Sequence, residues 1–111
     1  MTNEELVRDY LNSLDLSEIS DSVHLVDLNF ERSSYSEILD AIYSLYLDVA
    51  KISKFIVNNL DKKENLDENK IVDEFKKKSK VLDKILSFKP IYDDLTKFIN
   101  AKNNNLIKKT S

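Results

Sequence analysis

Apolar residues recur at intervals of three and four over residues 34–60, which is the period of one face of an α-helix. One stripe runs from Ile38 to Ile56, and a second stripe beside it runs from Leu39 to Leu60. Together the two stripes occupy most of the helix circumference and leave a narrow polar strip. The pattern predicts a central helix that must be covered on more than one side, either by the rest of the chain or by a partner.

Three further segments carry a single apolar stripe at the same period. They predict helices over about residues 2–14, 66–88 and 90–104. Apolar and polar residues alternate from Val26 to Phe30, and no second strand is available to pair with this stretch. We therefore expect residues 15–32 to wrap one side of the core. From about residue 105 we expect a short mobile tail. The whole pattern predicts a single all-α domain, an antiparallel four-helix bundle.

The predicted helix starts carry local signals. Thr2 with Glu5, and Ser34 with Glu37, have the spacing of a capping box, in which a hydroxyl accepts the backbone N–H three residues on. Pro90 disfavours helical geometry at the residue before it and suits the first turn of a new helix. These signals place helix starts near residues 2, 34 and 90.

The composition of the 111-residue chain excludes several kinds of site. Without glycine there is no phosphate-binding P-loop and no dinucleotide-binding turn, because both bring backbone N–H groups close to a phosphate. Without cysteine there is no thiolate zinc site, iron–sulfur cluster, disulfide or cysteine nucleophile. No segment resembles a calcium loop, which normally needs a glycine at its sharp turn. We therefore expect no metal and no cofactor.

Catalytic signatures are also missing. A Ser-His-Asp arrangement would have to use His24, the one histidine, in a small helical chain that has no turn suited to an oxyanion hole. Adjacent carboxylates such as Asp93 and Asp94 fall in predicted first turns, where they stabilise the helix dipole. We therefore predict no catalytic residue, a protein that is not an enzyme, and infer no small-molecule substrate.

The first residues indicate where the protein acts. Residues 1–9 carry three acidic side chains and no cationic patch before an apolar run, the opposite of a secretory signal. No window approaches the ~20 apolar residues that a transmembrane helix needs. We expect a cytoplasmic protein with no membrane span.

Charge is distributed unevenly along the chain. Residues 1–48 hold eleven Asp and Glu against two Arg, a net charge of −9, whereas residues 49–111 hold fifteen Lys against nine Asp and Glu, a net charge of +6. Opposite charges on neighbouring helices would favour one antiparallel arrangement over others. The alternative is that one pole stays free and attracts a partner of opposite charge. We favour the internal use of the charges, where the first helix and the segment after it pack beside the last two helices.

A candidate docking surface lies on the central helix. Leu47 and Phe55 fall outside its two main stripes, with Lys51 and Lys54 nearby. Either the segment from Val26 to Phe30 covers these apolar side chains, or they form a patch for another protein. On this basis we expect a non-enzymatic interaction module, such as a small adaptor, an assembly subunit or an inhibitor. Its partner would be another protein or a second copy of the chain.

Two alternatives remain open. One is a small immunity-like, antitoxin-like or phage-type protein that neutralises a toxin or a defence enzyme. The other is weak association with nucleic-acid phosphates through a lysine cluster on the third helix, formed by Lys76, Lys77, Lys80 and Lys84. The cluster contains no Arg, and the net charge of the chain is −3, so the composition argues against nucleic acid as the main partner.

Overall fold

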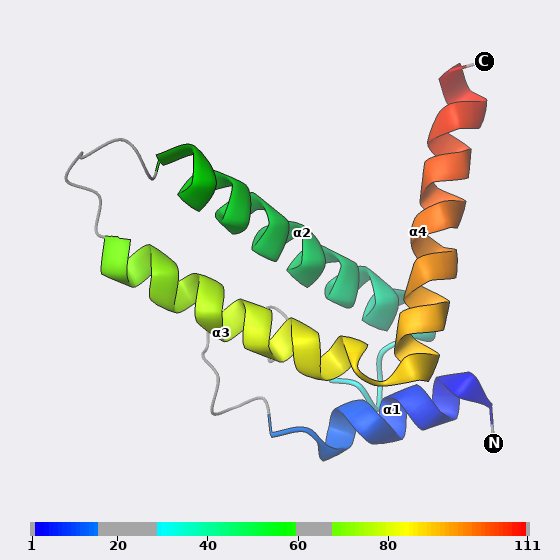
Figure 1. The fold of residues 1–111 in the computed structure, drawn as a ribbon. Coiled ribbons are helices and arrows are strands. Elements are labelled where there is room, and N and C mark those ends of the chain that lie inside the picture. Colours follow the sequence, from blue (N-terminus) through cyan, green and yellow to red (C-terminus); the bar gives the residue numbers. More distant parts are fainter. Residues whose placement is uncertain (1, 16–28, 60–67, 111) are drawn as a thin grey trace.

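The computed structural model describes residues 2–15, 29–59 and 68–110, which form four α-helices and, within these ranges, no strand (Figure 1). The helices are α1 (Asn3–Ser13), α2 (Tyr35–Asn59), α3 (Glu68–Leu86) and α4 (Lys89–Thr110). The predicted all-α, four-helix fold is confirmed, and the helix boundaries in the described ranges agree with the predicted ones to within two residues, except at the end of α4.

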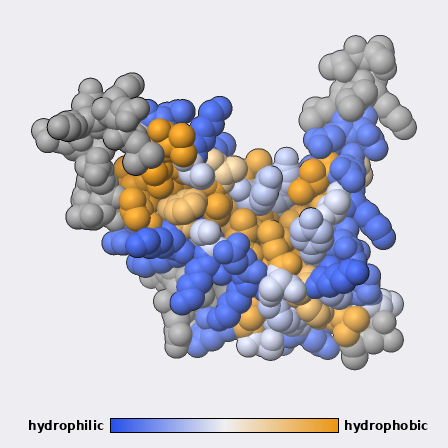
Figure 2. Space-filling model, viewed as in Figure 1, coloured by the Kyte–Doolittle hydropathy of each residue, from blue (hydrophilic) through white to orange (hydrophobic). Residues whose placement is uncertain are grey.

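The four helices form a thin, open arrangement. α2 and α3 lie side by side and run antiparallel, α1 lies across the corner where α3 passes into α4, and α4 leaves that corner and diverges from α2 (Figure 1). The space-filling view shows an open notch between the α2–α3 arm and α4 (Figure 2). The radius of gyration is 16.0 Å, whereas a compact chain of this length has about 13 Å. The smallest dimension, 21 Å, is the thickness of two helices.

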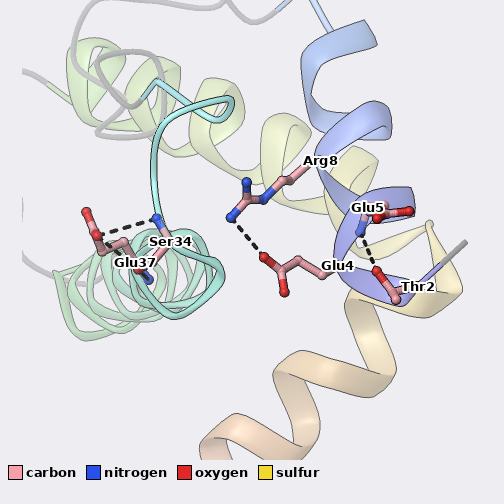
Figure 3. Close-up of polar contacts among 6 residues, drawn as sticks. All are labelled: Thr2, Glu4, Glu5, Arg8, Ser34 and Glu37. Carbon is pink, nitrogen blue, oxygen red and sulfur yellow. Dashed lines mark hydrogen bonds and ion pairs between the residues drawn. The ribbon is translucent and has the colours of Figure 1, made fainter.

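Both predicted capping signals are formed (Figure 3). Thr2 Oγ1 accepts a hydrogen bond of 3.2 Å from the backbone N–H of Glu5 at the start of α1. Ser34 and Glu37 cap α2 reciprocally: the Glu37 N–H donates to Ser34 Oγ at 3.2 Å, and the Ser34 N–H donates to Glu37 Oε1 at 3.4 Å. Local side-chain chemistry therefore sets where these two helices begin.

A short corner joins α3 to α4 and holds α1. The turn consists of Ser87 and Phe88, and Pro90 lies in the first turn of α4 as predicted. Phe88 stacks on the Tyr10 ring of α1 with ring centroids 4.4 Å apart. The Tyr10 hydroxyl also donates to the backbone carbonyl of Lys84 at 2.7 Å. A stacked ring and one hydrogen bond thus fix α1 against this corner.

The hydrophobic core lies where the helices converge, at the first half of α2. Its centre is formed by side chains with no exposed surface, including Ile42, Ile85 and Ile91. α1 contributes Val7 and Leu11. The buried residues of α2 all lie between its start and Leu45; beyond Leu45, Val49 is half-buried and packs against the core.

The structure near Phe30 differs from the predicted extended segment. The chain near Phe30 forms a turn rather than an extended segment, because the Asn29 carbonyl accepts from the Arg32 and Ser33 N–H groups at 3.1 and 2.9 Å. The Asn29 side chain accepts from the Glu31 N–H at 3.1 Å, which favours the turn. Phe30 is nevertheless buried in the core. The rest of the predicted wrapping segment, residues 16–28, lies outside the described residues.

α4 is longer than predicted. It continues to Thr110, where the sequence pattern indicated an end near residue 104 and a tail from about residue 105. The asparagines at 103–105 do not end the helix, because asparagine is only a moderately weak helix former and no glycine or proline follows to stop the chain.

Candidate docking face on the second half of α2

The second apolar stripe of α2 is buried in its first half and exposed in its second. Leu39 is 6% exposed, whereas Tyr46 and Val57, seven and eighteen residues further along the helix, are 44% and 64% exposed. Ala50, between them on the same side, is also exposed. We call Tyr46, Leu47, Ala50, Ser53 and Val57 the α2 outer face. Figure 2 shows apolar side chains gathered over α2 and in the angle between α2 and α4.

The direction of α4 explains this difference. An ion pair of 2.6 Å joins Lys102 Nζ to Asp40 Oδ1, and the same ammonium lies 5.0 Å from the centre of the Tyr43 ring and 4.6 Å from that of Phe98. The Tyr43 and Phe98 rings meet edge to face at 6.3 Å. These contacts attach α4 to the first half of α2. Beyond them the two helices diverge, which leaves the α2 outer face uncovered by α4 (Figure 1).

A part-buried hydrogen bond also joins the start of α2 to α4. The Tyr35 hydroxyl, at the start of α2, donates to Asp94 Oδ2 in the first part of α4. Burial raises the pKa of Tyr35, and the hydrogen bond to Asp94 and the charges of Asp94 and Glu4 raise it further. Tyr35 therefore stays a hydrogen-bond donor well above the pH at which an ordinary tyrosine ionises.

The other side of α2 is held by α3. Lys78 is 7% exposed, and its ammonium lies 3.5 Å from Asp48 of α2 and 3.2 Å from Glu74 of its own helix. Asp40 with Lys102 and Asp48 with Lys78 are two ion pairs that join the acidic first half of the chain to the lysine-rich second half. The acidic residues of these two pairs come from α2. We expected the first helix and the segment after it to supply such residues, and most of that segment, residues 16–28, lies outside the described ranges. Arg8 of α1 instead pairs with Glu4 of the same helix at 2.9 Å (Figure 3).

The four residues predicted to bind a partner lie on one side of α2. Leu47, Lys51, Lys54 and Phe55 follow the helical spacing of four, seven and eight residues, and all four are exposed. Leu47 is 39% exposed and Phe55 is 42% exposed. Leu47 borders the stripe of Tyr46 and Ala50. Phe55 lies roughly 140° around the helix from Ala50, because each residue turns the helix by about 100°.

The sequence analysis therefore missed part of the exposed apolar surface. Tyr46, Ala50 and Val57 belong to the regular second stripe, whereas the candidate docking residues were taken from positions outside both stripes. The available signal was the excess of apolar positions on α2, which indicated that more than one side of the helix needs cover, either from the chain or from a partner. The direction of α4 determines which positions are exposed, and the spacing of apolar residues on α2 gives no information about that direction.

The predicted anion-binding lysines are on the outer surface of α3. Lys76, Lys77, Lys80 and Lys84 are all exposed. Lys78, in the middle of the same run, points instead toward α2 and is buried. The four lysines share a solvent-facing side of one helix, with Asp73 and Asp83 on the same helix also exposed. The weak association with nucleic acid stays a prediction.

Other candidate chemistry receives no support from the described ranges. His24 lies outside them. Within residues 2–15, 29–59 and 68–110, no three His, Cys, Asp or Glu side chains gather in the way a metal ion requires. No helix in this part of the chain has the length and apolar character to cross a bilayer. Comparisons with protein-family models, with curated proteins and with solved structures find no match for this chain.

Proposed function

We propose that the protein is a non-enzymatic interaction module that docks another protein chain on the α2 outer face. The observation that supports this most directly is the exposure of Tyr46 and Val57 on a stripe whose first residue, Leu39, is buried in the core. Isolated exposed apolar residues are common on protein surfaces and need no explanation. Here several of them share one side of one helix, beside an open notch (Figure 2). Contiguous apolar patches of this kind mark interaction sites.

The chemistry of the face also suits a protein partner. A tyrosine and aliphatic side chains form its centre, and Lys51 and Lys54 lie at one edge. Interfaces typically have an apolar centre enriched in aromatic residues and a polar rim. Between Val49 and Asn59 the helix carries these two lysines and no carboxylate. A partner with an apolar stripe bordered by neutral or acidic residues would fit this surface.

Site-specific photocrosslinking tests the proposal. A photoreactive amino acid is introduced at Val57 and, as a control, at Lys77 on the outer surface of α3. Both variants are expressed in cells of the source organism. We expect a discrete covalent adduct from position 57 and none from position 77. Adduct formation from a probe at Leu47 should also be lost when the chain carries Val57→Asp, which places a charge in the centre of the face.

Two outcomes of the photocrosslinking would contradict the proposal. The proposal is wrong if position 57 gives no adduct, or if positions 57 and 77 give the same adducts. The mass of the adduct also separates the possible roles, because an adaptor, an assembly subunit and a toxin-neutralising inhibitor would each capture a different protein. The expected cytoplasmic location belongs to this proposal, and the compartment in which the adduct forms tests it.

A further inference from the structure

We draw no further inference here: the strongest candidate, the exposed apolar side of the second half of α2 beside the notch toward α4, carries nothing beyond the proposed function, because nothing in the structure shows what covers it.

Discussion

The hydrogen bond between Tyr35 and Asp94 holds the start of α2 to α4, so removing it should destabilise the whole fold. Tyr35→Phe deletes only the hydroxyl and keeps the packed ring. A hydrogen bond to a charged group contributes about 1.5–3 kcal/mol. Because this pair is part-buried, we expect a loss near the lower end, about 1.5 kcal/mol. For a chain of this length that corresponds to a fall in Tm of about 6 °C.

The pH dependence of the same variant provides a second check. The folded-state pKa of Tyr35 lies above 10.0, its ordinary value, because of burial and the Asp94 contact. As the pH rises through 10, the unfolded chain therefore loses this proton before the folded chain does. The contribution of Tyr35 is fully present below pH 10 and declines above it. The difference in stability between the wild type and Tyr35→Phe should be constant from pH 7 to 9 and shrink at higher pH.

Urea unfolding followed by circular dichroism measures these differences. Tyr92→Phe is the matched control, because Tyr92 is on the same helix as Asp94 and is 54% exposed. We expect this control to lie within about 0.5 kcal/mol of the wild type. The reasoning is refuted if Tyr35→Phe and Tyr92→Phe have equal free energies of unfolding, or if the Tyr35→Phe difference grows rather than shrinks above pH 10.

Three other tests, each by urea titration, probe separate parts of the fold. Ile42→Ala should lower the free energy of unfolding by about 2–5 kcal/mol, because Ile42 is fully buried. Val57→Ala on the same helix should change this free energy by less than about 0.5 kcal/mol, because Val57 is exposed. Equal effects of the two substitutions would contradict the division of α2 into a buried and an exposed half. Ser34→Ala removes the reciprocal cap of α2 and should lower stability by about 0.5–2 kcal/mol, and no loss would show that the cap is dispensable. The free energy of unfolding of Lys78→Met should lie within about 1 kcal/mol of the wild-type value. The methionine keeps the packing of the lysine stem, and both carboxylate partners still reach water. A loss of several kcal/mol would mean that the charge of Lys78 itself holds α2 to α3.

Features determined by neighbours in sequence could be predicted from the sequence. The Ser34 cap, the Pro90 start and the apolar period of α2 each depend on residues within one or two helical turns, and the structure contains all three. The asparagines near residue 104 show the limit of this reasoning. They lower helix propensity by a few tenths of a kcal/mol, which is too little to end a helix by itself.

The exposed part of α2 could not be predicted in the same way. It depends on the direction of α4. The contacts that set this direction are Tyr35 with Asp94 and Asp40 with Lys102, and the two residues of each contact are separated by 59 and 62 positions in the sequence. The apolar count of α2 indicated that the helix needs cover on more than one side, from the chain or from a partner, and the off-stripe positions indicated Leu47. The exposure of Tyr46 and Val57 could not be predicted from their regular spacing, because an apolar stripe has the same spacing whether it packs against its own chain or against another.

The division of α2 into a buried half and an open half separates two evolutionary constraints on one helix. Substitutions before Leu45 act on folding, because that stretch contains the buried side chains of the helix. Substitutions at the exposed positions Tyr46, Ala50 and Val57 meet solvent, so the fold persists when they change. Under the proposed function, these exposed positions can diversify in what they bind, while the buried first half of the helix keeps the fold unchanged.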